Sequence, residues 1–227
     1  MASEGLLYKG EGASPICVAY LQSALIKRGI GLELIDDRHF LQEGWDKYID
    51  LLIMPGGRDL PYHKKFAGKI NRKIKQFVEG GGAYWGICAG AYFGASFVEF
   101  DKDGPLEVVG ERELGFFPGK AVGPAYTDKR FVYSSNAGAR VAKLAYGDRV
   151  VYNHFNGGCI FQDADKFSGV DVIARYAELP SSPAAIIRCK CGKGRALLCG
   201  THPEYPVDDN DEERIHFFDD LINNHLN

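Results

Sequence analysis

The most constraining stretch of the sequence is the run GGGAYWGICAGAYFG at residues 80–94. Three glycines precede a short apolar segment, and the pentapeptide GICAG, centred on Cys88, then leads into small and aromatic residues. This spacing is typical of a nucleophile elbow, a sharp strand-to-helix turn that leaves no room for side chains two positions to either side of its centre. The sequence therefore predicts a strand, a strained turn at Cys88 and a helix.

A cysteine at the centre of such a turn is suited to act as a nucleophile. The helix that follows directs its first backbone amides at the sulfur, and this favours the attacking thiolate. The alternative is a small buried thiol beside a glycine-rich turn, because free cysteine is often buried. The complete pattern favours the nucleophile, and we expect Cys88 to be the most reactive of the six cysteines. Cys17 and Cys199 stand in apolar segments, where we expect them to be shielded.

A second motif, THPEY at residues 201–205, supplies a candidate base. It follows the apolar run 196–200, which predicts a buried strand. His202 and Glu204 are two positions apart, so their side chains share a face in an extended chain, and Pro203 restricts the backbone towards that conformation. Glu204 can then hold one nitrogen of His202 while the other faces Cys88. The alternative is a surface histidine beside a solvated carboxylate.

Together these motifs resemble the class I glutamine amidotransferases. MPGG at residues 54–57 follows an apolar strand and is similar to the loop that supplies an oxyanion-hole amide in those enzymes. The segments MPGGRDLPY, GGGAYWGICAGAYFG, NHFNGG and THPEY look most like the amidotransferase-like N-terminal domain of eukaryotic-type biotin-protein ligases, which also occurs as a free-standing protein. The resemblance covers nearly the whole chain. It implies a flavodoxin-like, three-layer α/β fold, in which helices cover both faces of a mostly parallel sheet.

The resemblance also implies roles for individual residues. Cys88, His202 and Glu204 would form a catalytic triad. Backbone amides after the nucleophile and in the MPGG loop would hold the oxyanion, namely those of Ala89 and of Gly56 or Gly57. Glutamine-using members commonly carry Gln shortly after the elbow, where this chain has Tyr92. Their glutamine-binding residues therefore do not carry over, and we expect free glutamine to be a poor substrate.

The segment NHFNGG at residues 153–158 has two interpretations. Clustered asparagine and glycine residues can line a pocket with side-chain and backbone amides, or they can form an ordinary turn that closes a hairpin. The aromatic residue just after the nucleophile can also close a pocket. The candidate pocket residues are Tyr92, Asn153, Asn156, Gly157 and Gly158.

Composition limits the other classes of function. A chain of 227 residues that is 45% hydrophobic can form one large α/β domain, and the absence of a linker or repeat favours a single domain over residues 1–227. The net charge of −3, with no basic stripe, favours no nucleic-acid partner, and no apolar run is long enough to cross a membrane. A catalytic thiol without a secretory signal predicts a cytoplasmic protein.

The remaining elements are expected from apolar periodicity and turn residues. One amphipathic helix is expected over residues 64–79, with Gly80 ending it. The other expected elements are strands at residues 6–8, 30–35, 50–54, 106–109, 113–117, 149–155, 172–176, 184–188 and 196–200, and helices at residues 15–28 and 211–226.

No cofactor or metal is expected. Cys189, Cys191 and Cys199 lack the paired spacing of structural zinc sites, so packing is their expected role. The segment around Lys193 is no phosphate loop, and the motifs of a biotin ligase catalytic domain do not occur. The resemblance therefore concerns the accessory domain of those ligases only.

The sequence thus predicts a cysteine-dependent amidotransferase-like hydrolase that acts on a small-molecule amide, with a ligase or synthetase as a possible partner protein. Two alternatives remain open. One is a non-catalytic regulatory module that uses the same pocket to bind a small molecule or a partner. The other is a redox sensor in which Cys88 oxidises to a sulfenic acid.

Overall fold

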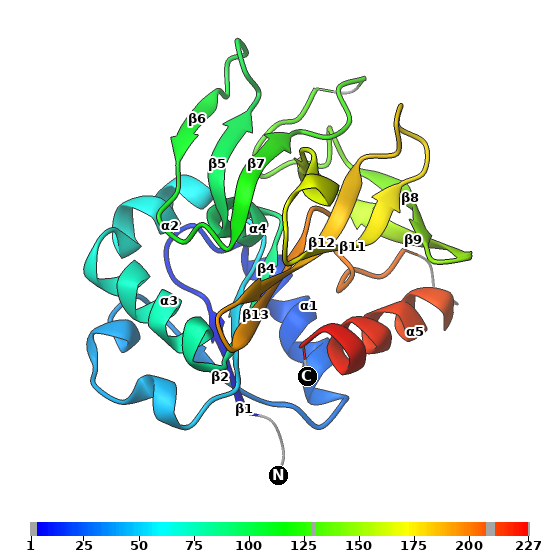
Figure 1. The fold of residues 1–227 in the computed structure, drawn as a ribbon. Helices are drawn as coiled ribbons and strands as arrows, with labels where there is room; N and C mark the ends of the chain where they lie inside the picture. Colours follow the sequence, from blue (N-terminus) through cyan, green and yellow to red (C-terminus); the bar gives the residue numbers. More distant parts are fainter. Residues whose placement is uncertain (1–3, 129, 208–211, 227) are drawn as a thin grey trace.

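A parallel sheet forms the centre of the molecule. The structure is a computed structural model that describes residues 4–128, 130–207 and 212–226, and within these ranges the strands form one 13-stranded mixed sheet (Figure 1). Neighbouring parallel strands follow the order β2-β1-β3-β4-β13. Their bounds are β1 Glu4–Tyr8, β2 Gly31–Ile35, β3 Leu51–Met54, β4 Ala83–Ile87 and β13 Gly194–Cys199.

Beyond β13 the sheet becomes largely antiparallel and branches at β12 (Ala184–Cys191). One branch continues through β10 and β7 to the parallel neighbour β5 and the edge strand β6, with bounds Ile160–Phe161, Phe117–Gly123, Ala95–Phe100 and Val108–Glu111. The other branch continues through β11, β8 and β9, with bounds Val170–Tyr176, Arg140–Tyr146 and Arg149–Phe155.

Helices cover both faces of the parallel strands (Figure 1). Successive side chains of β1 point to opposite faces, and accordingly Leu6 and Tyr8 belong to one hydrophobic core while Leu7 belongs to the other. The first core packs against α2 (Asp59–Phe66), α3 (Lys69–Gly80) and α4 (Ala89–Gly94). The second packs against α1 (Pro15–Ile26) and α5 (Glu212–Asp220), which continues as a π-helix over Leu221–Leu226. The expected α/β fold with helices on both faces is confirmed.

The helix expected over residues 64–79 is in fact two helices. The chain leaves α2 at Phe66 and enters α3 at Lys69, and Gly68 between them has a φ of 73°. Glycine adopts this left-handed conformation without steric cost, so the apolar periodicity continues across a break that it does not reveal. The start of the C-terminal helix expected at residue 211 lies outside the described residues.

The strands expected at residues 106–109 and 113–117 are displaced. They correspond to β6 at Val108–Glu111 and β7 at Phe117–Gly123, and residues 112–116 between them form a connecting loop. Arg112 bonds the carboxylate of Asp59, and Gly115 has a φ of 56°. Leu114 and Phe116 of this loop are buried in the core. Their apolar side chains explain why the sequence predicted a strand at this place.

Candidate active site

The candidate site lies where parallel strands end. The loops that follow β1, β3, β4 and β13 meet at one edge of the sheet, where ligands bind in folds of this kind. They enclose a cavity of about 960 Å³. Cys88 and His202 both line this cavity, together with residues of the loop after β3 and of the segment before β8. Two motifs that are far apart in the sequence therefore reach the same cavity.

Cys88 stands at a strained strand-to-helix turn, as the sequence predicts. Its φ of 48° and ψ of −103° place it between β4 and α4 in a conformation that non-glycine residues rarely adopt. Two backbone hydrogen bonds hold the turn: the Cys88 amide donates to the Cys199 carbonyl at 2.8 Å, and the Gly90 amide donates to the Pro55 carbonyl at 3.2 Å. The elbow is thus fixed to the ends of both strands that flank β4.

The glycines of the elbow are required by close backbone contacts. A Cβ atom on Gly86 would lie 2.4 Å from the Gly90 carbonyl oxygen, and one on Gly90 would lie 2.0 Å from the Met54 carbonyl oxygen. Both distances are far below van der Waals contact. The atoms that a side chain would meet are backbone carbonyl oxygens, which cannot move aside easily. The G-x-C-x-G spacing is therefore a steric consequence of the turn.

His202 and Glu204 form a buried pair after β13. The Nδ1 atom of His202 lies 2.8 Å from the Glu204 carboxylate, and the two residues are only 4% and 3% exposed. Burial lowers the pKa of His202, but the charge of Glu204, followed by those of Cys17 and Cys88, outweighs it, so the pKa lies well above its usual value. The His202 amide also donates to the His154 carbonyl at 2.8 Å, which attaches the loop to β9.

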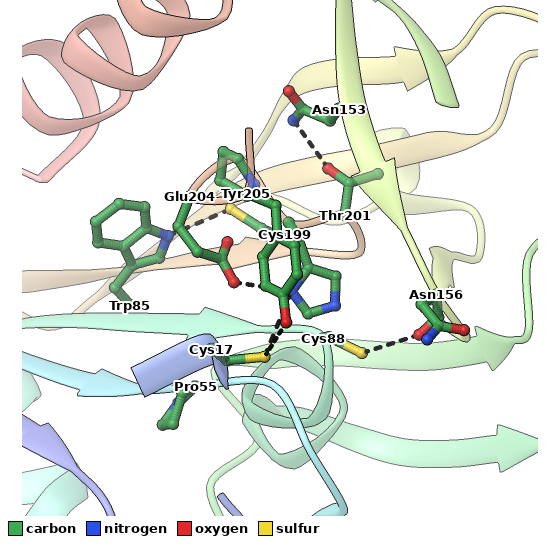
Figure 2. Close-up of polar contacts among 12 residues, drawn as sticks. Cys17, Pro55, Trp85, Cys88, Asn153, Asn156, Cys199, Thr201, Glu204 and Tyr205 are labelled. Carbon is green, nitrogen blue, oxygen red and sulfur yellow. Dashed lines mark hydrogen bonds and ion pairs between the residues drawn. The ribbon is translucent and has the colours of Figure 1, made fainter. Parts of the chain in front are cut away.

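The sulfur of Cys88 is close to the loop that follows β9. The thiol is 6% exposed and hydrogen-bonds the Asn156 carbonyl at 3.8 Å (Figure 2). Among the described residues, no hydrogen bond joins this sulfur to the ring of His202. The charge of Cys88 nevertheless contributes to the raised pKa of His202, and both residues line the same cavity. The catalytic roles of Cys88, His202 and Glu204 remain predictions.

A second cysteine, which sequence reasoning missed, lies beside the histidine. The sulfur of Cys17 in α1 is 3.9 Å from Nδ1 of His202. It also lies 3.7 Å from the hydroxyl of Tyr205 (Figure 2). The sequence predicts that Cys17 is shielded in apolar surroundings. The shielding is confirmed, since Cys17 is only 4% exposed. The apolar surroundings are wrong, because Cys17 lines the cavity and contacts two polar groups. The only sequence signal was its place in the first turn of a helix that follows β1.

The side chains of Cys17, His202 and Glu204 also form a possible metal-ligand set. Their ligand atoms lie within 4.8 Å of one another, and all three residues are buried. The hydrogen bond between His202 and Glu204 accounts for the spacing of those two residues without an ion. A structural zinc site would need a fourth protein ligand, and we assign no metal to this cluster.

The candidate oxyanion donors lie beside Cys88. Gly57 and Ala89 line a small cavity of about 20 Å³ together with the cysteine, room for roughly one water-sized group. Gly56 is not among the residues around either cavity; a Cβ on it would lie 2.5 Å from the ring of His202. Of the two amides proposed from the MPGG loop, that of Gly57 is therefore the better placed.

The candidate pocket residues divide into two groups. Tyr92, Asn156 and Gly157 line the small cavity beside Cys88, and the Tyr92 hydroxyl donates to the Gly157 carbonyl at 3.1 Å. Asn153 is fully buried and donates to the Thr201 hydroxyl at 3.1 Å, while Gly158 packs against the Gly200 carbonyl. The second group thus supports the wall from behind. Residues 156–158 connect β9 to β10 and do not close a hairpin.

The other cysteines are packing residues. Cys159, Cys189 and Cys199 are at most 1% exposed, Cys191 is 9% exposed, and all six cysteines are free thiols. Burial raises the pKa of Cys199 to about 12, and it accepts a hydrogen bond from the Trp85 indole at 3.3 Å (Figure 2).

Over the described ranges, none of the helices is both long and apolar enough to cross a membrane.

Comparisons with known proteins identify relatives that match most of the chain. The family model described as "Biotin-protein ligase, N terminal" matches residues 3–225. An uncharacterised protein of Chlamydia muridarum is 41% identical over 88% of this chain and 80% of its own length. A biotin–protein ligase of Schizosaccharomyces pombe is 42% identical over 89% of this chain, and the match spans 33% of that ligase.

Solved structures share the fold at low sequence identity. A chain from the structure of PurLQS from Thermotoga maritima has a TM-score of 0.67 and 16% identity, with 98% of this chain and 99% of that chain covered. A protein from Thermoplasma acidophilum, described as a putative GMP synthase component, has a TM-score of 0.55 and 14% identity, with coverages of 98% and 93%. The fold is therefore that of the class I glutamine amidotransferases.

A stability measurement can test the steric role of the elbow. Gly90→Ala should lower the free energy of unfolding by about 3 kcal/mol or more, because the new methyl group collides with the Met54 carbonyl. Gly80→Ala, at the last residue of α3, is the matched control, because no atom in the described part of the chain lies within 4 Å of its Cβ position. Denaturant unfolding of both variants should show a loss only for Gly90→Ala, and equal stability would contradict the close approach.

The pH dependence of stability can test the surroundings of His154. Burial, and then the charge of His202, lowers the pKa of His154 from 6.5 to about 4, and the ring stacks on Tyr205 with 4.6 Å between centroids. As the pH falls, His154 becomes protonated in the unfolded chain before it does in the folded protein. The stability that neutral His154 contributes is therefore complete above pH ~6.5 and is lost as the pH falls towards 4.

His154→Phe keeps the stacking and removes the titration. Between pH 6.5 and 4 the wild type should lose on the order of 1 kcal/mol of stability relative to this variant, a discounted figure because the ring is only partly buried. Unfolding free energies at four or five pH values would provide the comparison. Parallel pH profiles for the two proteins would show that His154 is not held neutral.

Proposed function

The chain belongs to the family of biotin-protein ligase N-terminal domains, and from this premise we propose that it is a cysteine-dependent hydrolase of amides or related carbonyl compounds. One observation carries the proposal. A cysteine in a strained turn and a buried histidine that is held by a glutamate line the same cavity at the carboxyl ends of parallel strands. A nucleophile, a base and a group that orients the base are the parts that such chemistry requires.

The proposed reaction begins with the Cys88 thiolate and protonated His202. The raised pKa of His202 favours this charge state near neutral pH. The sulfur attacks the carbonyl carbon and forms a C–S bond, while the carbonyl electrons become an oxyanion. When the intermediate collapses, the C–N bond breaks and His202 gives its proton to the leaving nitrogen. Water, deprotonated by His202, then cleaves the thioester, which releases a carboxylic acid and restores the Cys88 thiolate and protonated His202.

We assign the oxyanion to the small cavity beside Cys88. The amides of Ala89 and Gly57 are the proposed donors, because both residues line this cavity and it has room for about one oxygen atom. Each such donor contributes on the order of 3 kcal/mol to the stabilisation of the transition state. Glu204 takes the role of the orienting group, since its hydrogen bond to Nδ1 leaves Nε2 for proton transfer.

A small-molecule substrate and a partner protein are part of the proposal. About two thirds of the S. pombe ligase has no counterpart in this chain, since the match spans 33% of it. We therefore propose a ligase or synthetase as the class of partner. A reducing, cytoplasmic location accords with free thiols at all six cysteines.

Alkylation of the cysteines tests the nucleophile and its base. With limiting iodoacetamide near neutral pH, the Cys88 peptide should be labelled first among the six cysteines. His202→Ala should slow this labelling by roughly tenfold or more, because the thiolate loses its partner cation. His202→Gln is the matched variant, since it keeps a hydrogen-bond donor for Glu204. Peptide mapping by mass spectrometry gives the order; first labelling elsewhere would contradict the proposal.

The same assay separates the alternative functions. A glutamine-analogue electrophile should label Cys88 faster than iodoacetamide does, relative to a free thiol, if the site binds amides. Equal relative rates, together with no effect of His202→Ala, would favour a non-catalytic binding module. Spontaneous sulfenic acid at Cys88 with slow alkylation would favour a redox sensor.

Free glutamine should be a poor substrate. The Tyr92 hydroxyl is bonded to the Gly157 carbonyl and fills the position just after the elbow, where glutamine-using relatives carry Gln. Ammonia release from glutamine should stay far below the typical enzyme turnover of ~10 per second, with or without a synthetase partner. Turnover near that value, measured by a coupled ammonia assay, would show that the exclusion of glutamine is wrong.

A further inference from the structure

Arg58 follows the proposed oxyanion loop directly and lines the cavity that contains Cys88. Its backbone position is fixed on both sides of Gly57. The Arg58 amide donates to the Gly12 carbonyl and the Ser14 amide donates to the Gly56 carbonyl, each at 2.8 Å. The side chain, in contrast, is exposed. The chain thus places an exposed cation on the wall of the cavity that contains Cys88.

The guanidinium of Arg58 lies on an aromatic ring, and not on a carboxylate. It sits 4.6 Å from the centre of the Tyr133 ring, and Tyr133 lines both the large cavity and the small cavity beside Cys88. Within residues 4–128, 130–207 and 212–226, no acidic side chain forms an ion pair with Arg58. Stacking on the ring orients the guanidinium and leaves its N–H groups available.

The acidic side chains near Arg58 have other cationic partners. Asp59 accepts two hydrogen bonds from the buried guanidinium of Arg112, at 2.8 and 2.6 Å. Glu11, the acidic residue on the wall of the large cavity, lies 3.5 Å from Lys65. The charge of Arg58 is therefore the one that the protein leaves without a close negative counterpart on this wall of the cavity.

We propose that Arg58 binds a carboxylate of the substrate, so that the substrate class is an amide that carries a free carboxylate group. This inference rests on the proposed function and adds a specificity-determining residue to it. The planar guanidinium offers a fork of N–H donors that matches a carboxylate. A carboxylate also balances one arginine charge, whereas a phosphate dianion would keep an uncompensated charge in a partly enclosed site.

The proposal can be tested at Cys88 with two alkylating reagents of similar size. Iodoacetate carries a carboxylate and iodoacetamide carries a neutral amide, so the ratio of their rates reports attraction of the anion. Normalised to the same ratio for a free thiol, the wild-type ratio should be roughly 3- to 10-fold higher than that of Arg58→Met. The iodoacetamide rate itself should change less than about twofold, and this distinguishes a lost anion contact from a displaced nucleophile.

Two further variants serve as controls. Lys64→Met removes a nearby exposed cation that does not line the cavity of Cys88, and it should leave the ratio at the wild-type value. Arg58→Lys keeps the charge without the fork and should give an intermediate ratio. An equal ratio in the wild type and Arg58→Met, or an equal drop in Lys64→Met, would overturn the role of Arg58.

Equilibrium binding separates this inference from the proposed catalysis. Calorimetry with Cys88→Ala should detect binding of succinamate, a small amide with one carboxylate, and binding should weaken roughly tenfold when Arg58→Met is added. Inorganic phosphate at the same concentration should not compete. The carboxylate assignment would be overturned if Arg58→Met left the affinity for succinamate unchanged, or if phosphate competed equally well. If succinamate binding depends on Arg58 but Cys88 is unreactive in the alkylation assay, the carboxylate subsite is supported and the proposed hydrolase is contradicted.

Discussion

Two backbone hydrogen bonds determine the geometry on which the candidate site depends. The amide of Cys88 donates to the end of β13, and the amide of Gly90 donates to the residue after β3. A left-handed conformation at a non-glycine residue costs on the order of 1–3 kcal/mol and persists only where neighbours enforce it. The order β3-β4-β13 supplies these neighbours. The strand order thus holds the cysteine in the turn and brings the loop of His202 to the same cavity.

Burying the pair of His202 and Glu204 costs free energy, because the Glu204 carboxylate is removed from water. Removing an ionised carboxylate from water is unfavourable unless it is paired and hydrogen-bonded. One carboxylate oxygen of Glu204 is bonded to His202, while the other is buried and has no hydrogen-bond partner among the described residues. The Glu204 carboxylate stabilises the charged imidazole of His202, although burial opposes that charge. The pKa of His202 is raised as a result. Perturbed titration in a cavity is characteristic of functional sites.

The sequence predicts the parts of the site that depend on short-range patterns. The elbow follows from the spacing around Cys88, and the shared face of His202 and Glu204 follows from two positions of extended chain. The contact of Cys17 with His202 could not be predicted, because it depends on how α1, which packs beside β1 and β2, meets the loop that follows β13. The break at Gly68 was missed because the apolar periodicity continues across it. The strands β6 and β7 were misplaced because the loop at residues 112–116 between them buries apolar side chains, as a strand does.

The elbow also joins the two hydrophobic cores of the molecule. Cys88 packs with the core beneath α1 and α5, whereas Ala89, the next residue, packs with the core beneath α2 and α3. The chain therefore passes from one face of the sheet to the other at the proposed nucleophile. Because interiors are densely packed, a change in either core alters the turn. The proposed oxyanion amide of Ala89 and the sulfur of Cys88 are consequently held by different cores, and their alignment depends on the sheet that separates them.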